Sequence, residues 1–206
     1  MNILISLLVG YLFGSIPFGL LLTRAVGIDI RSVGSGNIGA TNVLRTGKRW
    51  LALATLLLDA GKGIVAVLLA GRLLGTADPS DIVPFAAGIG AFIGHVFPVW
   101  LRLNGGKGVA TYIGILFAWH WSVGLAFCGT WLIIAFARKY SSLAALTAAA
   151  TAPLFAYGLA GSEKSGLNMA AACALLSLLL FYRHWGNIQR LIKGTEPKIG
   201  SEKSKA

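Results

Sequence analysis

Long apolar runs alternate with short polar segments along the whole chain, and this pattern predicts a bundle of membrane-spanning helices. The runs approach the length of about 20 residues that a helix needs to cross the hydrocarbon core of a bilayer. They are continuous rather than alternating, which favours helices over the strands of a closed barrel, the other structure that can span a bilayer. The expected spans are Ile3–Leu22, Trp50–Leu74, Ile82–Leu101, Val109–Trp119, Ser122–Ala137, Leu143–Leu159 and Leu167–Tyr182.

We divide Gly108–Ala137 into a fourth and a fifth span, although this region is continuous enough to form one helix. At 1.5 Å per residue such a helix is about 45 Å long, which is too long for one crossing without strong tilt. A break near His120 gives two short crossings, or a re-entrant hairpin, and returns the chain to its starting side. The basic residues that flank the region then share one side, as the positive-inside rule requires: Arg102, Lys107, Arg138 and Lys139.

Basic residues are distributed unevenly between the loops, and this sets the expected orientation. With seven crossings the outer loops hold only Arg72 and Lys164, near Asp78, Asp81 and Glu163. The other side holds Arg24, Arg31, Arg45, Lys48, Arg49, Arg102, Lys107, Arg138, Lys139, Arg183, Arg190, Lys193, Lys198, Lys203 and Lys205. Because Lys and Arg concentrate in cytoplasmic loops, we expect an all-α, polytopic transmembrane helix bundle with its N-terminus outside and its C-terminus inside.

Composition agrees with a membrane protein and excludes other classes. The chain is 56% hydrophobic and only 12% charged, and no stretch of soluble composition is long enough for a separate domain. Its net charge of +11 does not indicate nucleic-acid binding, because the basic residues flank apolar runs. Cys128 and Cys173 lie inside apolar runs without metal-ligand spacing. The N-terminal run lacks a basic segment and a clear cleavage site, so we interpret it as a retained span.

Three polar, glycine-rich patches interrupt the apolar pattern, and the expected topology places them all on the cytoplasmic face. They are Ser32–Arg45, Asn104–Thr111 and Arg183–Glu196. Glycines allow tight turns and offer N–H groups to an anion. Lys107, Arg45, Arg183 and Arg190 add fixed positive charge. The combination predicts a phosphate-handling site at a membrane surface.

The first patch contains the spacing Gly34-x-Gly36-x-x-Gly39, but it is not a dinucleotide-binding fingerprint. That motif joins a strand to a helix within a βαβ unit, and no sheet can be built around this segment. Its local physics still favours an anion, with free N–H donors and a helix that starts near Thr41 or Asn42. A flexible glycine loop is the alternative interpretation.

Within the second patch, the segment Gly105–Thr111 lacks the glycine spacing of a Walker motif. It is instead typical of a glycine turn that opens a helix, where Lys107 and amide donors could meet one phosphate. A lysine that extends to the membrane interface is the alternative.

Ionisable residues inside the apolar runs are further candidates. Asp59 and Lys62 share one helix face, and charges at membrane depth are functional hypotheses by default. A structural ion pair between helices is the alternative, and Lys62 is the better placed of the two to reach a ligand.

The three histidines differ in their surroundings. His184 lies among polar groups and could accept a proton or bind an oxyanion, with Asn187 on the same helix face. His95 is typical of a core histidine, and His120 of an interfacial one. The chain lacks the Gly-x-Ser-x-Gly, His-Glu-x-x-His and His-x-x-x-x-Asp motifs. Strong anion binding without an evident nucleophile or base suggests a preactivated substrate.

These residues resemble the bacterial integral-membrane acyl-phosphate:glycerol-3-phosphate acyltransferases. Segments Ser32–Arg45 and Gly105–Thr111 match the first two motifs of that family. The third motif matches at Arg183, His184, Asn187, Ile188, Arg190, Leu191 and Glu196, and further similarity lies at Leu58, Asp59, Lys62, Gly63, Gly94, His95 and Pro98. The similarity runs in matching order over nearly the whole chain.

The resemblance implies transfer of a fatty acyl group from acyl phosphate to the 1-position of glycerol 3-phosphate, in phospholipid biosynthesis. The products are 1-acylglycerol 3-phosphate (lysophosphatidic acid) and phosphate. It implies seven spans in the bacterial inner membrane, a cytoplasmic active site in contact with membrane lipid, and no metal or other cofactor. Residues 1–196 would form one transmembrane catalytic domain, and residues 197–206 a disordered basic cytoplasmic tail.

The resemblance also implies roles for individual residues. Lys107, His184 and Arg45 are the expected catalytic residues. The expected substrate-binding residues are Ser35, Asn37, Thr41, Asn42, Lys62, Gly106, Gly108, Ser142 and Asn187. Either His184 or a donor phosphate oxygen could take the proton of the acceptor hydroxyl. Trp185 departs from the family pattern, in which a charged residue usually follows the histidine.

Two other functions fit parts of the pattern. A transporter for a phosphorylated solute would explain the intramembrane charges, but it requires a polar path to both faces, and the outer loops are short and plain. A non-catalytic membrane scaffold leaves three glycine and cation patches on one face unexplained.

Overall fold

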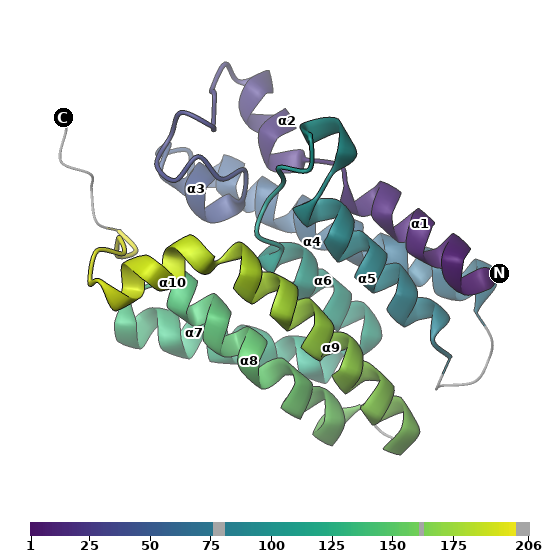
Figure 1. Cartoon of the computed structure of the whole chain (residues 1–206). Helices are drawn as coiled ribbons and strands as arrows, with labels where there is room; N and C mark the ends of the chain where they lie inside the picture. The colour runs from purple at the N-terminus through teal and green to yellow at the C-terminus, as the bar shows by residue number, and fades with distance from the viewer. Residues whose placement is uncertain (76–80, 161–162, 201–206) are drawn as a thin grey trace.

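The computed structural model describes residues 1–75, 81–160 and 163–200, and every regular element in these ranges is helical. In Figure 1 the long helices run side by side, and α2, α3 and α10 gather at the end of the bundle away from the N-terminus. The elements are α1 (Asn2–Gly14), α2 (Phe18–Ala25), α3 (Ala40–Leu44), α4 (Arg49–Leu74), α5 (Val83–Val96), the 3-10 helix η1 (Val99–Leu101), α6 (Val109–Trp119), α7 (Trp121–Arg138), α8 (Ser141–Leu159), α9 (Glu163–Arg183) and α10 (Trp185–Ile192).

Six segments of the described chain are long and apolar enough to cross a membrane. They are Asn2–Ala25, Arg49–Leu74, Val83–Leu101, Trp121–Arg138, Ser141–Leu159 and Lys164–Arg183. The remaining expected span is α6, a shorter apolar helix of 11 residues, which is roughly 16 Å long. The helical class and six of the expected spans therefore agree with the structure, and α6 is the short one.

The predicted break at His120 is confirmed. Helix α6 ends at Trp119 and α7 begins at Trp121. His120 between them is extended, with φ −159° and ψ 112°, and its Nδ1 lies 2.8 Å from the Ser122 hydroxyl.

The first expected span, Ile3–Leu22, lies within the apolar segment Asn2–Ala25, but this segment forms two helices rather than one. Helix α1 ends at Gly14 and α2 begins at Phe18. Pro17 has no N–H to donate and disfavours the helical conformation at Ile16. In this break the Ile16 carbonyl accepts hydrogen bonds from the Phe18 N–H at 3.1 Å and from Lys62 at 2.7 Å.

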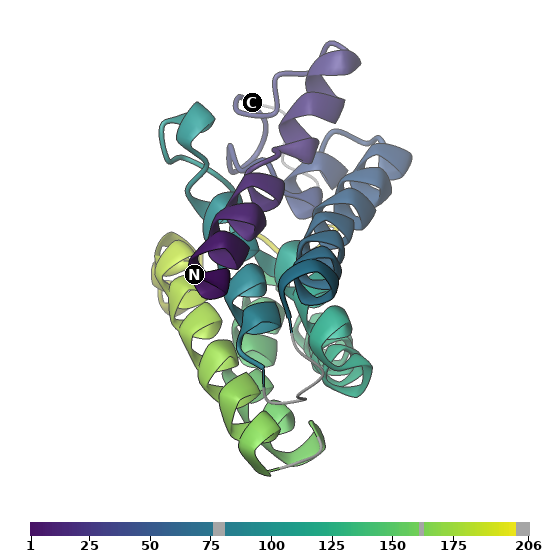
Figure 2. The same cartoon turned by 90° about the vertical axis from the view of Figure 1, so that its right-hand side faces the viewer.

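Helix α6 lies at the centre of the bundle, and its neighbours enclose it. Tyr112, Ile115 and Leu116 are fully buried. Figure 2, turned by 90°, shows the other long helices around it. The outer surface carries exposed leucines such as Leu57 and Leu178, as a bundle in contact with lipid requires.

Glycines bring the backbones of α1 and α5 into direct contact. Gly10 and Gly14 of α1 face α5, and Gly90 and Gly94 of α5 face α1. A Cβ on Gly14 would lie 1.9 Å from the Ala91 carbonyl oxygen, and one on Gly94 would lie 2.2 Å from that of Tyr11. Small residues four apart are what lets helices approach closely in lipid, where the hydrophobic effect does not drive them together.

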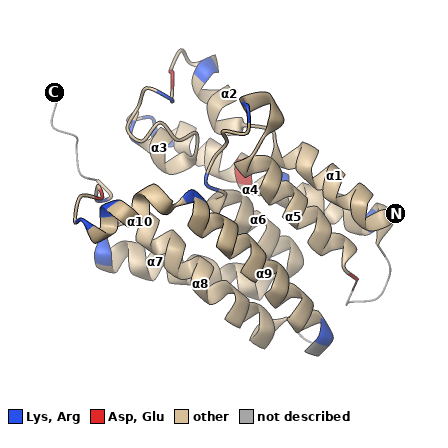
Figure 3. Ribbon diagram, viewed as in Figure 1, with Lys and Arg blue, Asp and Glu red and all other residues tan. Residues whose placement is uncertain are grey.

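Charged residues concentrate at one end of the bundle. In the ribbon of Figure 3, most Lys and Arg residues lie near α2, α3 and α10. Arg72, in the last turn of α4, and Lys164, near the start of α9, lie toward the other end. The three polar patches therefore share one end of the molecule, as the sequence predicts.

Part of the predicted tail is placed. The Ile199 N–H donates to the Lys139 carbonyl at 2.6 Å, and the Lys198 ammonium lies 5.8 Å from the centre of the Tyr140 ring. Residues 201–206, and Asp78 of the expected outer loops, lie outside the described residues.

We expect Gly14→Val to lower the unfolding temperature of the detergent-purified protein by several degrees, because the new side chain would strike the α5 backbone. Overpacking of this kind costs roughly 1–3 kcal/mol. Gly61→Val is the matched control, since a Cβ at Gly61 meets no atom within 4 Å. Equal unfolding temperatures for the two variants would show that α1 and α5 do not pack through this glycine.

Candidate active site

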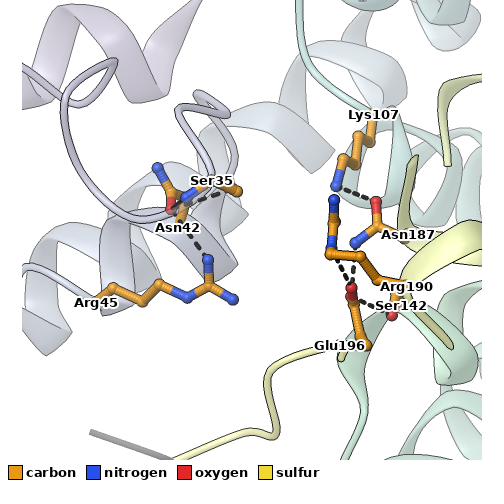
Figure 4. A network of polar contacts seen from close by, with 8 residues as sticks. All are labelled: Ser35, Asn42, Arg45, Lys107, Ser142, Asn187, Arg190 and Glu196. Carbon is orange, nitrogen blue, oxygen red and sulfur yellow. Dashed lines mark hydrogen bonds and ion pairs between the residues drawn. The ribbon is translucent and has the colours of Figure 1, made fainter. Parts of the chain in front are cut away.

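The three polar patches meet where α3, α8 and α10 approach one another. Figure 4 shows the first patch, with Ser35, Asn42 and Arg45, facing Lys107 of the second and the polar side chains of α10. The Thr41 hydroxyl lies 3.3 Å from that of Ser141 at the start of α8, which joins the first patch directly to the other half of the bundle.

Asn42 holds the first loop together. Its side chain is only 2% exposed. Its amide nitrogen donates to the carbonyls of Ile30, Val33 and Asn37 at 3.3, 2.9 and 2.8 Å. Its amide oxygen accepts from the Ser35 N–H at 3.0 Å, the Ser35 hydroxyl at 3.2 Å and Arg45 Nη1 at 3.4 Å. The hydrogen bonds of Asn42 are therefore made inside the loop, where they set the positions of Ser35 and Arg45.

The glycines of the first loop have backbone conformations that other residues rarely adopt. Gly34 has φ +52° and Gly36 has φ +69°. A Cβ on Gly34 would lie 2.6 Å from Asn42 Oδ1 and 2.8 Å from Arg45 Cδ. Helix α3 starts at Ala40, with Gly39 as its N-cap, one residue before the expected start.

The second loop is bound through its backbone to α5 and α9. The Gly105 N–H donates to the Val96 carbonyl and the Gly106 N–H to the His95 carbonyl, each at 3.1 Å. Arg183 donates to the Gly105 and Gly106 carbonyls at 3.2 and 3.3 Å. The Gly106 amide, expected to bind phosphate, is thus engaged by α5. The loop turns into α6 at Gly108, whose φ is +88°.

A chain of hydrogen bonds links Lys107 to the third patch (Figure 4). The Lys107 ammonium donates to Asn187 Oδ1 at 2.5 Å. Asn187 Nδ2 and the Ser142 hydroxyl each donate to Glu196 Oε1 at 2.6 Å. Arg190 Nε donates to Glu196 Oε2 at 2.7 Å, which completes an ion pair. Lys107, Asn187 and Ser142, all expected at the site, are therefore brought together by Glu196.

The charges in this hydrogen-bonded network favour the binding of an anion. Burial lowers the pKa of Lys107 to about 8; Glu196 opposes that shift, and the charges of Arg190, Arg45 and Arg183 reinforce it. Burial by itself would raise the pKa of Glu196, but the hydrogen bonds from Ser142, Asn187 and Arg190 lower it below its usual range. One carboxylate therefore faces several cations.

His184 is a buried, neutral imidazole. It is 3% exposed, and its Nδ1 lies 2.9 Å from the Leu180 carbonyl. Since a carbonyl can only accept, Nδ1 carries the proton and Nε2 is left as an acceptor. Burial and the nearby charge of Lys107 lower the pKa of His184 to about 4.

Lys62 lies apart from the network in Figure 4. Its ammonium bonds to Asp59 Oδ1 at 2.7 Å, to the Ile16 carbonyl at 2.7 Å and to His95 Nδ1 at 2.9 Å. Lys62, expected to bind a ligand, is thus held by two hydrogen bonds and one ion pair. The ion pair lies within α4 rather than between two helices, and Lys62 is the member that reaches the neighbouring segments, at Ile16 and His95.

Glu196 and Arg190 join this network, although neither is among the expected catalytic or substrate-binding residues. Both belong to the third patch and to the family motif. The signal was a single carboxylate among Arg183, Arg190 and Lys193, but nothing in the sequence shows that this carboxylate returns to Ser142. Among the described residues, no group of three or more His, Cys, Asp or Glu side chains could hold a metal ion.

Known proteins are similar to this chain in both sequence and fold. The family model described as glycerol-3-phosphate acyltransferase matches residues 4–194. The glycerol-3-phosphate acyltransferase of Mesorhizobium japonicum is 54% identical over 98% of both chains. That of Paramagnetospirillum magneticum is 57% identical over 94% of this chain and 92% of its own.

Solved structures agree with the sequence comparison. The glycerol 3-phosphate form of PlsY (YgiH), an integral membrane glycerol 3-phosphate acyltransferase, superposes with a TM-score of 0.87. It is 37% identical and covers 97% of this chain and 96% of its own. The lysophosphatidic acid form of PlsY superposes with a TM-score of 0.85. The matched family model, the relatives above half identity and the common fold show that the chain belongs to the glycerol-3-phosphate acyltransferase family of integral membrane enzymes.

Proposed function

We propose that this acyltransferase moves a fatty acyl group from acyl phosphate to the 1-hydroxyl of glycerol 3-phosphate. The products are 1-acylglycerol 3-phosphate and inorganic phosphate. The observation that carries the proposal is the position of Lys107, whose ammonium lies among Arg45, Arg183 and Arg190 with one carboxylate, Glu196, nearby. Two phosphate groups, one on each substrate, supply the missing negative charge. The relatives and the two PlsY forms support this choice of acceptor and product.

The cations stabilise the charge that moves during the reaction. The acceptor oxygen forms a bond to the acyl carbon, and the bond from that carbon to the phosphate oxygen breaks. Negative charge develops first on the carbonyl oxygen and then on the departing phosphate, and fixed donors aimed at such charge are the largest single source of catalysis in many enzymes. Lys107 and Arg45 have this role, and Ser35, Asn37 and Thr41 line the same loop as phosphate ligands.

Transfer is direct rather than through an acyl-serine. Ser142 is the hydroxyl best placed to be a nucleophile, because it is bonded to a carboxylate at 2.6 Å. That carboxylate also accepts from Asn187 and Arg190, and these bonds hold its pKa below the usual range. A general base works best with a pKa near the working pH, so Glu196 is poorly suited to activate Ser142. The acyl phosphate is already activated and needs no such intermediate.

The acceptor proton goes to an oxygen of the departing phosphate. His184 is the alternative base, but its pKa of about 4 is far from neutral pH. Its free Nε2 instead accepts a hydrogen bond from a glycerol hydroxyl, which orients the acceptor for attack.

The proposed topology has seven crossings in the inner membrane, an outside N-terminus and a cytoplasmic active site, with α6 and α7 as two short crossings. Its support is the concentration of Lys and Arg at the end of the bundle that carries the site (Figure 3). Residues 1–196 then form one catalytic domain in contact with membrane lipid, with the basic tail in the cytoplasm.

The direct test is an assay of the purified protein with glycerol 3-phosphate and palmitoyl phosphate, followed by mass spectrometry of the lipid product. We expect 1-palmitoylglycerol 3-phosphate with palmitoyl phosphate and none with palmitoyl-CoA. Product from palmitoyl-CoA alone would overturn the assignment of the donor.

Lys107→Ala and Arg45→Ala should each reduce kcat/KM about ten- to a hundredfold, because a lost charge-assisted hydrogen bond costs roughly 1.5–3 kcal/mol. Lys193→Ala is the matched control, since Lys193 is an exposed cation of the third patch. Near-native rates in both alanine variants would remove the two cations from the site.

The pH dependence tests Lys107 separately. Its ammonium is charged below a pKa of about 8 and loses its charge as the pH rises, so native kcat/KM should fall above about pH 8. Lys107→Arg should be slower, because the guanidinium fork does not fit the site of a point charge, and should lose this fall because arginine stays charged. An unchanged alkaline limb in Lys107→Arg would assign the limb to another group.

His184→Asn should keep kcat within about tenfold of native and raise the KM for glycerol 3-phosphate. The amide preserves hydrogen bonding but cannot titrate. Loss of a general base typically lowers the rate 10²- to 10⁴-fold. A thousandfold fall in kcat at unchanged KM would make His184 the base.

Cysteines on either side of α7 test the topology. In a variant without the native cysteines, Trp121→Cys should react with an impermeant reagent in intact spheroplasts, and Arg138→Cys only after permeabilisation. Both positions are exposed in the structure. Labelling of both from the same side would contradict the crossing by α7.

A further inference from the structure

A buried cluster of charged and polar side chains lies in the spanning region, outside the site described above. Asp59 and Lys62 of α4 form an ion pair, and His95 of α5 joins them with its Nδ1 2.9 Å from the Lys62 ammonium and 3.7 Å from Asp59 Oδ1. All three side chains are at most 4% exposed. The proposed reaction uses none of them.

The contacts fix the protonation of His95. An ammonium can donate but cannot accept, so His95 Nδ1 accepts from Lys62 and the imidazole proton lies on Nε2. Lys62 also donates to the carbonyl of Ile16 at 2.7 Å, in the break between α1 and α2. The cluster thus sets the ring orientation of His95 from three different helical segments.

Stability alone is a weak reason to keep such a cluster. Charges within a bilayer are costly. A buried ion pair often contributes no more than an apolar pair of the same shape, although removing one partner is strongly destabilising. We therefore look for the role of the cluster in the contacts that His95 makes.

His95 contacts the loop that carries Lys107 at two points. Its carbonyl accepts the Gly106 N–H at 3.1 Å. Its imidazole covers the Gly106 Cα so closely that a Cβ there would lie 2.1 Å from His95 Nε2. Arg183 binds the Gly106 carbonyl from the other side at 3.3 Å. Gly106 is thus held at its N–H, its Cα and its carbonyl, immediately before Lys107.

We propose that Asp59, Lys62 and His95 are positioning residues, which lock the His95 ring against Gly106 and thereby hold the Lys107 ammonium at Asn187. The proposal rests on the function proposed above only for the importance of Lys107. The cluster itself touches no substrate. It transmits the relative position of α1, α4 and α5 to the catalytic loop, and a small rotation of the His95 ring would displace the backbone next to Lys107.

A complementary pair of substitutions tests the contact between His95 and Gly106. Gly106→Ala adds a methyl group where the His95 ring lies, and should lower kcat/KM at least tenfold. His95→Asn keeps an acceptor near the position of Nδ1 but removes the ring edge, so the double variant should recover at least fivefold over Gly106→Ala. A double variant whose loss equals the product of the two single losses would overturn the proposal.

A second test measures Lys107 without any acyl donor. In Asp59→Asn/Lys62→Met both charges are removed together, so no unpaired charge remains buried. The pH dependence of Lys107 modification by an amine reagent, followed by mass spectrometry, reports its titration. Because burial is the main cause of the lowered pKa of Lys107, a loosened loop should move its titration from about 8 toward the ordinary value of about 10.4 for lysine.

The outcomes separate positioning from simple structural support. Unfolding temperature is measured in parallel, with Gly61→Ala on α4 as the control variant. A folded Asp59→Asn/Lys62→Met variant with a shifted Lys107 titration and kcat/KM reduced at least tenfold supports the proposal. An unchanged titration with kcat/KM within twofold of native overturns it. If Asp59→Asn/Lys62→Met does not fold, the comparison of Gly106→Ala, His95→Asn and their double variant tests the proposal instead. Failure of the native protein to use palmitoyl phosphate leaves the titration readable, so it counts against the donor and not against the cluster.

Discussion

The repulsion between like charges at one end of the bundle is the constraint on which the rest of the site depends. The charges of Arg45, Arg183 and Arg190 act on Lys107 there, and Glu196 is the carboxylate that opposes them. Neutral groups hold two of these cations: Arg183 donates to loop carbonyls, and Lys107 to the amide oxygen of Asn187. Like charges held together in this way repel one another. In the proposed reaction, substrate binding supplies the charge that the fold omits.

A site of this kind requires a rigid frame, because the cations would otherwise move apart. Close backbone contacts between helices supply it. A Cβ on Gly114 of α6 would lie 1.9 Å from the Ala60 carbonyl of α4, and one on Gly63 of α4 would lie 2.8 Å from that of Thr111. Together with the glycines between α1 and α5, these contacts fix four helices by shape rather than by apolar attraction, which lipid does not provide. The loop that carries Lys107, which is bonded to α5 and α9, then has little freedom.

The sequence predicts the fold better than it predicts the site. Hydropathy and basic-loop bias are local signals, and they suffice for six spans, the break at His120 and the gathering of three patches at one end. The roles of Asn42 and Lys62 depend on partners distant in the chain. Asn42 matches a phosphate ligand by type, yet its bonds reach back to Ile30 and Val33; Lys62 finds the Ile16 carbonyl only because Pro17 interrupts the first helix. Glu196 meets Ser142 across 54 residues, which no local pattern encodes.

Glu196 also explains why one acid among so many bases is useful. Without it, Arg190 would face Lys107 across Asn187 with no anion between them, and Asn187 would lose the acceptor that orients its amide. With it, the Asn187 amide nitrogen points to the carboxylate, so its oxygen must point to Lys107. The carboxylate thus fixes the position of the Lys107 ammonium through Asn187, which lies between them. A direct ion pair would neutralise Lys107 and compete with phosphate. An intervening amide preserves its charge for the substrate and still fixes its position.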